Sequence, residues 1–281
     1  MTAKPQRTAR LPDGTEVPSL GQGTWHMGER GSDRRAEADA LRLGLDLGMT
    51  LIDTAEMYAD GGAEEVVRDA IAGRREEVFL VSKVYPQNAS RARMARSCEA
   101  SLRRMGVEAI DLYLLHWRGG VPLAETVEAF ERLIEAGKIR RWGVSNLDVD
   151  DLEELGAALP DCATDQVLYN LEARGPEYDL LPFCRDHRMP VMAYSPVGQG
   201  GRMLGKPALR EVAARHGTGP ATIALAFTLR REGIIAIPKA ADPAHVRQNA
   251  AAQEITLTEE DLRALDAAFP PPRRKQALAM L

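Results

Sequence analysis

Cysteine is scarce in this sequence, and the few cysteines are not arranged for cross-linking. Cys98, Cys162 and Cys184 are the only three in 281 residues, and no two of them form a CxxC pair. A disulfide framework needs an even set of cysteines, and a zinc site needs closely spaced cysteine or histidine ligands. We therefore expect reduced thiols in a cytoplasmic protein, and no metal site.

Long apolar runs and excess positive charge are also missing. The N-terminal stretch MTAKPQRTARLPDG has no apolar run behind its charges, and no uncharged apolar run approaches the roughly 18 residues that cross a bilayer. The formal net charge of −5 gives the chain no electrostatic attraction to a polyphosphate backbone or an anionic membrane. These absences exclude nucleic acid and membrane as expected partners.

Short apolar runs are frequent, and they alternate with helical patterns along the whole chain. Eight of these runs are rich in aliphatic, β-branched or aromatic residues, which is typical of buried parallel strands. Successive runs start 24 to 44 residues apart, which is the length of one strand and one helix. The predicted strands are residues 19–25, 50–55, 78–84, 110–117, 139–146, 163–170, 190–196 and 234–240.

Eight such units favour a single α/β domain over residues 1–281, built as a closed (β/α)8 TIM barrel. An open, doubly wound sheet is the alternative. Residues 8–20 contain a Pro-Asp-Gly turn and predict an N-terminal hairpin. Two extra helices are expected after the eighth strand, over residues 243–252 and 258–269.

Candidate catalytic residues stand at the carboxyl ends of the predicted strands, where barrels place their active sites. Asp53 ends the second strand and Tyr58 lies in the following turn, while Lys83 ends the third strand and His116 ends the fourth. Taken singly, each is more often a cap, a core residue or a solvated charge. The chain has only six lysines and five histidines, so one of each at neighbouring strand ends favours a shared site.

These four side chains suit the reduction of a carbonyl group. A tyrosine with its ordinary pKa of about 10 is a weak acid at neutral pH, so we expect the Lys83 ammonium to lower the pKa of Tyr58. Asp53 would hold Lys83 charged, and His116 would orient the carbonyl oxygen. Such a set protonates an oxyanion as it forms, and the hydride must come from elsewhere.

A phosphate-binding site is expected after the seventh and eighth strands, where barrels often bind phosphate. The seventh strand runs into the glycine-rich stretch 194–202, and Lys239 ends the eighth, so free amides and an ammonium would meet there. The residues that would hold a carboxamide and stack on a flat ring are Ser145, Asn146, Gln166 and Tyr194.

The predicted strands and the residues that follow them, taken in chain order, resemble the aldo-keto reductase superfamily. The resemblance is carried by LIDTAEMYADGGAEEVV, VFLVSKV, IDLYLLHW, IRRWGVSNL, ATDQVLYN, MAYSPVGQG and IIAIPKAADPAHVRQNAA, which together extend over nearly the whole chain. It implies a (β/α)8 barrel without a Rossmann domain and a catalytic tetrad of Asp53, Tyr58, Lys83 and His116, with Tyr58 as the general acid. The stretch IDTAEMYADGGAE is most similar to bacterial members that reduce methylglyoxal and other small aldehydes.

The resemblance also implies a cofactor, NADPH, and the residues around it. The substrate pocket would be walled by Trp25, Tyr85 and Trp117 beside Tyr58 and His116. The implied cofactor-binding residues are Gly23, Thr24, Trp25, Asp53, Ser145, Asn146, Gln166, Tyr194, Ser195, Val197, Gly198, Gln199, Lys239, His245, Gln248 and Asn249.

Two features depart from the family pattern. Many relatives that prefer NADPH have a hydroxyl residue after the lysine and an arginine six positions beyond it, where this sequence has Ala240 and His245. The segment after Phe269 is only a dozen residues long, whereas relatives acting on large substrates use a long C-terminal loop. We therefore expect an open, permissive pocket for a small carbonyl compound, in a monomer or weak oligomer.

Two other functions stay open at this point. A Schiff-base aldolase would use Lys83 or Lys239 to form an imine with a carbonyl substrate. A non-catalytic, nucleotide-sensing binding subunit would keep the cofactor site without turnover, although the complete tetrad argues against it.

Overall fold

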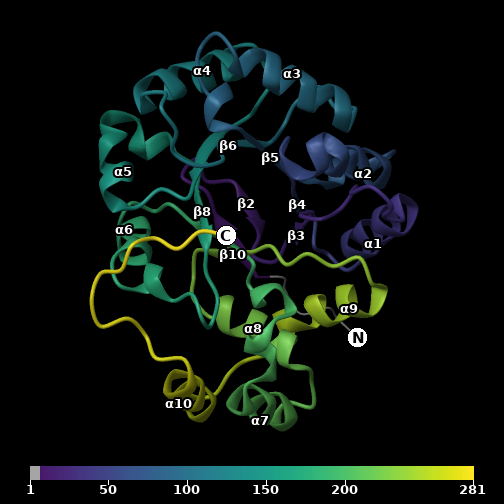
Figure 1. The fold of residues 1–281 in the computed structure, drawn as a ribbon, viewed down its shortest axis with the longest axis vertical. Helices are drawn as coiled ribbons and strands as arrows, with labels where there is room; N and C mark the ends of the chain where they lie inside the picture. The colour runs from purple at the N-terminus through teal and green to yellow at the C-terminus, as the bar shows by residue number, and fades with distance from the viewer. Residues whose placement is uncertain (1–6) are drawn as a thin grey trace.

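The computed structural model describes residues 7–281, and at its centre is a ring of eight parallel strands (Figure 1). Each strand pairs with the next one along the chain. All eight lie inside the ranges predicted from the sequence. They are β3 (Gln22–Gly23), β4 (Leu51–Asp53), β5 (Phe79–Val84), β6 (Leu112–Leu115), β7 (Trp142–Ser145), β8 (Asp165–Leu168), β9 (Val191–Tyr194) and β10 (Ile234–Ala236).

The sheet closes on itself between β3 and β10 through a small set of contacts. Leu20 forms a parallel bridge with Ala236, and Gly23 forms another with Lys239. The Gly23 amide donates a hydrogen bond of 3.0 Å to the Pro238 carbonyl. The closed (β/α)8 barrel is therefore confirmed, and the open sheet is wrong.

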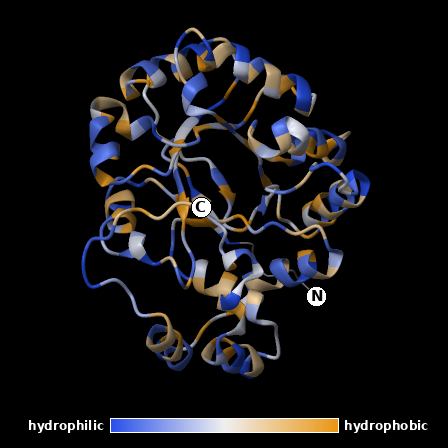
Figure 2. Ribbon diagram, viewed as in Figure 1, coloured by the Kyte–Doolittle hydropathy of each residue, from blue (hydrophilic) through white to orange (hydrophobic). Residues whose placement is uncertain are grey.

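Helices surround the barrel because each has an apolar face that packs against the strands. In α4, Leu123, Val127 and Phe130 recur three or four residues apart and are buried. Figure 2 shows hydrophilic residues on much of the outer surface of these helices. The helices are α1 (Arg34–Asp46), α2 (Gly62–Ile71), α3 (Met94–Met105), α4 (Leu123–Glu135), α5 (Val149–Glu154), α6 (Leu180–Asp186), α7 (Pro207–Arg215), α8 (Pro220–Thr228), α9 (Pro243–Ala251) and α10 (Glu259–Ala268).

The expected additions at both ends of the barrel are present. Strands β1 (Thr8–Arg10) and β2 (Glu16–Pro18) form the antiparallel hairpin, and the buried Leu11 and Val17 belong to the same apolar cluster as residues inside the barrel. Helices α9 and α10 are the two extra helices, and α10 begins at a capping box. The predicted domain starts at residue 1, and residues 1–6 lie outside the described residues.

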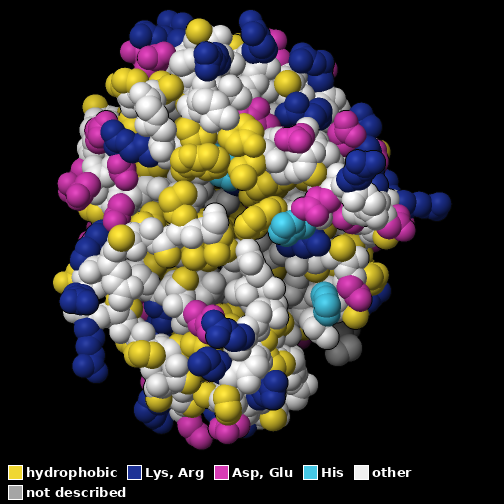
Figure 3. Space-filling view, viewed as in Figure 1, with side chains coloured by type: hydrophobic (Ala, Val, Ile, Leu, Met, Phe, Trp, Pro, Cys, Tyr) yellow, Lys and Arg dark blue, Asp and Glu magenta, His cyan; other side chains and the backbone are white. Residues whose placement is uncertain are grey.

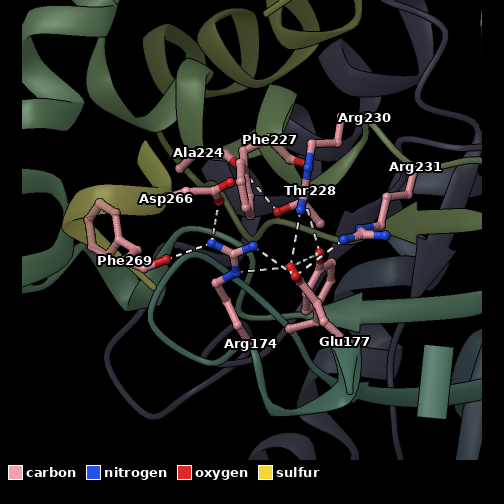
Figure 4. A network of polar contacts seen from close by, with 10 residues as sticks. Arg174, Glu177, Ala224, Phe227, Thr228, Arg230, Arg231, Asp266 and Phe269 are labelled. Atoms are coloured by element: carbon pink, nitrogen blue, oxygen red, sulfur yellow. Dashed lines mark hydrogen bonds and ion pairs between the residues drawn. The ribbon is translucent and has the colours of Figure 1, made fainter. Parts of the chain in front are cut away.

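The base of the C-terminal segment is fixed by a network of charged side chains (Figure 4). The buried Arg174 donates hydrogen bonds to the Phe269 carbonyl, to Asp266 at 2.6 Å and to Glu177 at 2.7 Å. Glu177 also accepts from Arg230 of the segment after α8, at 3.1 Å. The end of α10 is therefore tied to the loop that follows β8.

From there, residues 270–281 run back across the barrel, and the chain ends over its centre (Figure 1). Lys275 Nζ lies 2.5 Å from Asp148 Oδ1 and 2.6 Å from Asp179 Oδ2. These two aspartates are the N-caps of α5 and α6. Leu278 packs against the large apolar cluster of the barrel and its helices, so the segment lies on the surface where the strands end.

Candidate active site

A pocket of about 330 Å³ opens among the carboxyl ends of the strands. Figure 3 shows hydrophobic side chains gathered around a hollow in the middle of this face. The predicted site residues that line the pocket are Gly23, Thr24, Trp25, Asp53, Tyr58, His116, Trp117, Ser145, Asn146, Gln166, Tyr194, Ser195, Val197, Gln199 and Lys239.

Lys83 joins the acidic and phenolic groups of the predicted tetrad. Its Nζ donates hydrogen bonds to Asp53 Oδ2 at 2.7 Å, to the Thr54 carbonyl at 2.9 Å and to Tyr58 Oη at 3.2 Å. The register explains the contact, because Asp53 pairs with Val81 and side chains two residues apart on β5 share a face. Lys83 is fully buried and does not itself line the pocket, whereas Tyr58 and Asp53 do.

Asp53 and Lys83 form a buried ion pair. Burial alone would lower the pKa of Lys83, but the Asp53 carboxylate and the Tyr58 oxygen raise it above its ordinary value. Burial raises the pKa of Asp53, yet its carboxylate accepts from Lys83 on one oxygen and from Gln166 Nε2 on the other, at 2.8 Å. Two donors on one carboxyl favour the ionised form, so we assign the charged pair.

Tyr58 differs from the sequence prediction in its acidity. Burial raises the pKa of its phenol above the ordinary value, and the Lys83 ammonium opposes this rise without overcoming it. The expectation of a lowered pKa is wrong for this structure, because it counted the ammonium and left out the loss of water. Tyr58 is therefore a neutral phenol at neutral pH, with a proton to donate.

His116 faces Tyr58 across the pocket. It follows β6 directly, its amide donates to the Val84 carbonyl at 3.0 Å, and its ring meets the Tyr58 ring edge-on at 5.8 Å between centroids. Burial and the nearby charge of Lys83 lower the pKa of His116 to about 3. The imidazole is thus neutral and can donate an N–H to a carbonyl oxygen without competing as an acid.

A chain of polar side chains lines the opposite wall, at the ends of β7, β8 and β9. Ser145 Oγ donates to the Gln166 carbonyl at 2.8 Å, and Asn146 Nδ2 donates to Ser145 Oγ at 3.1 Å. Tyr194 Oη donates to Asn146 Oδ1 at 3.0 Å. These bonds fix the Asn146 amide, the Ser145 hydroxyl and the Tyr194 ring around one space.

The predicted phosphate-binding residues are only partly brought together. Ser195, Val197 and Gln199 line the pocket, whereas Gly198 does not. Lys239 is exposed at the rim, three residues beyond the end of β10 rather than at its last position. The three remaining cofactor candidates, His245, Gln248 and Asn249, lie on α9 and outside the pocket lining.

The substrate wall also differs in part from expectation. Trp25 and Trp117 line the pocket, but Tyr85 lies behind Trp117, edge-on to it at 5.9 Å between ring centroids. The sequence reasoning missed His26, Met57, Pro196, Ile237, Met280 and Leu281, which also line the pocket. Met57 could have been found because it precedes Tyr58 in the same turn.

Met280 and Leu281 line the pocket, so the short C-terminal segment reaches the site, although these residues are 50% and 62% exposed. The last dozen residues are few, but an extended chain covers roughly 3.3 Å per residue, so they span about 40 Å and reach the pocket from α10. No sequence pattern marks this path, because the segment has neither strand nor helical periodicity.

Within residues 7–281, no helix is both long and apolar enough to cross a membrane. The same residues contain no group of three or more histidine, cysteine, aspartate or glutamate side chains placed to hold a metal ion.

The chain belongs to the aldo/keto reductase family, whose sequence model matches residues 19–269. It is 53% identical over 283 residues to the methylglyoxal reductase YeaE of Escherichia coli (strain K12), with 98% of this chain and 99% of that protein covered. It is 31% identical over 264 residues to the glyoxal reductase of Bacillus subtilis (strain 168), with 92% of each covered. A crystal structure of an aldo/keto reductase from Klebsiella pneumoniae in complex with NADP and acetate matches with a TM-score of 0.96 and 53% identity, over 98% of this chain and 100% of that one.

Proposed function

We propose that this protein uses NADPH to reduce small aldehydes and α-ketoaldehydes, methylglyoxal among them, to alcohols. The observation that carries the proposal is the 3.2 Å contact between Lys83 Nζ and Tyr58 Oη on the pocket floor, with His116 opposite. The naming of the Escherichia coli relative as a methylglyoxal reductase supports the substrate class. The Klebsiella pneumoniae complex supports the coenzyme.

A nicotinamide coenzyme suits the residues present. Ser145 and Gln166 are almost fully buried yet line the pocket, and Tyr194 offers a ring face beside them. These groups would hold the carboxamide and the ring, the stretch 195–199 would face the phosphates, and Lys239 would meet the 2′-phosphate. When bound there, NADPH supplies the hydride.

The chain's own residues carry the proton. His116 donates its N–H to the carbonyl oxygen and fixes the substrate. Tyr58 then transfers its phenolic proton to that oxygen as the negative charge develops. Lys83 stabilises the phenolate that is left, and Asp53 holds Lys83 in place.

The Schiff-base alternative is disfavoured by the state of the lysines. Imine formation needs a neutral amine. Lys83 is fully buried, bound to Asp53 and has a raised pKa, so it stays protonated at neutral pH. Lys239 lines the pocket at its rim, where its side chain is exposed, and it hydrogen-bonds none of the four tetrad residues within the described part of the chain.

Replacing Tyr58 with phenylalanine tests the proposal. With methylglyoxal and NADPH, followed by the absorbance of the reduced nicotinamide, turnover should fall about 10²- to 10⁴-fold, as is typical of lost general acid catalysis. NADPH affinity should stay near the wild-type value. Tyr178→Phe, at an exposed tyrosine outside the pocket, is the matched control. Near-normal turnover of Tyr58→Phe would contradict the assignment of Tyr58 as the general acid. If the wild-type protein binds NADPH but reduces no aldehyde, the result would favour the nucleotide-sensing subunit.

We also propose that the chain is a single domain acting in the cytoplasm as a monomer or weak oligomer. The three free cysteines are all buried, which suits a reducing compartment. Burial raises the pKa of the Cys98 thiol to about 12, so this thiol stays protonated and unreactive. Light scattering on the purified protein measures the oligomeric state directly.

A further inference from the structure

The segment that carries Tyr58 is held in a costly backbone conformation. It connects β4 to α2 and contains only a short 3-10 turn, η1 (Tyr58–Gly61). Ala59 and Asp60, directly after the tyrosine, have φ angles of 50° and 52°. Two successive left-handed residues other than glycine persist only where the surroundings hold the backbone.

Packing holds the far end of this segment. Gly61 has a φ angle of 92°, and a Cβ there would lie 2.4 Å from Arg104 Cδ. Arg104 is itself fixed by a hydrogen bond of 2.6 Å from its Nε to Glu64. This end of the turn therefore packs closely against α3, at a position where a side chain would collide with Arg104.

A single carboxylate holds the near end. Glu56 Oε1 accepts hydrogen bonds from the Tyr85 amide at 2.7 Å and from Asn88 Nδ2 at 3.2 Å, and Oε2 accepts from the Ser97 hydroxyl of α3. Among residues 55–60, only Glu56 and Tyr58 hydrogen-bond other elements through their side chains. No cation pairs with Glu56 within the described residues, so three neutral donors hold it.

The same carboxylate connects the segment to the pocket wall. Tyr85, whose amide it binds, packs edge-on against Trp117, which lines the pocket. Glu56 itself lies outside the pocket lining. We infer that Glu56 is a positioning residue that fixes the Tyr58 phenol against Lys83. It does so by tying the Tyr58 segment to the loop that contains Tyr85 and Asn88. This inference rests on the proposed role of Tyr58 as the proton donor.

Two substitutions at one position test the inference. Glu56→Ala removes every acceptor, so kcat should fall about 10- to 100-fold, the order expected when a catalytic group is misplaced by about 1 Å. The NADPH dissociation constant should change less than about twofold, because Glu56 lies outside the pocket lining. The solvent isotope effect on kcat should rise, since proton transfer from a displaced Tyr58 is slower. A smaller folded fraction alone would lower kcat and leave the isotope effect unmoved.

Glu56→Gln keeps an oxygen for the Tyr85 and Asn88 donors, so it should retain most of the wild-type kcat and its isotope effect. Glu99→Ala is the matched control, because Glu99 lies on α3 and, among the described residues, pairs only with Lys138 at the surface. A wild-type kcat and isotope effect in Glu56→Ala would overturn the inference. Equal damage in Glu56→Gln and Glu56→Ala would overturn it as well.

A second variant keeps the test decisive if Glu56→Ala does not fold. Ser97→Ala removes only the donor to Oε2, and it should lower kcat a few-fold with a raised isotope effect. A wild-type result there would overturn the inference. Tyr58→Phe is measured in parallel: an active Tyr58→Phe would reject the proposed function, whereas an inactive Tyr58→Phe beside a normal Glu56→Ala would reject only the role of Glu56.

Discussion

Tyr58 and His116 face each other over the pocket floor, and their pKa values are shifted in opposite directions. Burial raises the pKa of Tyr58, while burial and Lys83 lower the pKa of His116 to about 3. A general acid works only below its own pKa, so Tyr58 stays competent through the neutral range. His116 stays neutral over the same range and contributes no change in charge.

The pH dependence of reduction should follow from these two shifts. We expect kcat to be level from about pH 5 to pH 9 and to decline only as Tyr58 loses its proton above its ordinary pKa of about 10. Initial rates at saturating NADPH and aldehyde, in buffers of constant ionic strength, measure this profile. An inflection near the ordinary histidine pKa of about 6.5 would contradict the neutral state of His116.

Asp165, on β8, should be neutral in the folded protein, and we expect its protonation to affect stability rather than catalysis. It is fully buried, neither carboxyl oxygen is hydrogen bonded within the described residues, and burial raises its pKa well above the ordinary value. Folding therefore takes up a proton, and stability falls as pH rises above about 4, the ordinary aspartate value.

Asp165→Asn should consequently stabilise the protein at pH 8. We expect the free energy of unfolding at pH 8 to increase, because the amide stays neutral there, whereas burial penalises the ionised Asp165 carboxylate. Urea unfolding at several pH values measures this gain, and the difference from wild type should shrink toward pH 4. Asp161→Asn, at an exposed position nearby, is the control. An equal gain at pH 8 and pH 4 would show that ionisation of Asp165 is not the cause.

At the scale of elements, the C-terminal segment depends on Lys275 for its place over the pocket. The side chain is 42% exposed, and it contacts the N-cap aspartates of both α5 and α6. Exposed ion pairs contribute only about 0.2 to 1 kcal/mol and weaken in salt. The segment is thus weakly held at this point, although Arg174 fixes its base.

Lys275→Met should let Met280 and Leu281 move away and admit larger aldehydes. The ratio of kcat/KM for a bulky aromatic aldehyde to that for methylglyoxal should rise by up to about fivefold, which corresponds to roughly 1 kcal/mol. High salt should produce a similar rise in the wild type. Lys138→Met serves as the control, since in the described part of the chain Lys138 pairs only with Glu99. A ratio that responds to neither the variant nor salt would show that the segment does not limit the pocket.

At the scale of the whole molecule, the barrel could be predicted from the sequence because its signals are local. Apolar strand runs, turn residues and helical periodicity recur along the chain, and all eight strands fall inside the predicted ranges. The course of residues 270–281 could not be predicted, because Lys275 and Asp148 are 127 positions apart. The raised pKa of Tyr58 depends on burial, and the three donors around Glu56 come from two other elements, so neither is visible in a local pattern.

The closure between β3 and β10 has a consequence for the stability of the ring. Gly23 and Lys239 form one of its bridges, and both also line the pocket. A coenzyme that contacts both would act as a non-covalent cross-link between the first and last repeats. Binding to the native state at 100 times the dissociation constant adds about 2.7 kcal/mol of stability. Hydrogen exchange should then slow most at the Gly21, Gly23 and Ala236 amides, which donate across this junction, when NADP+ is added. Uniform slowing over all strands would show that the coenzyme stabilises the ring without closing it.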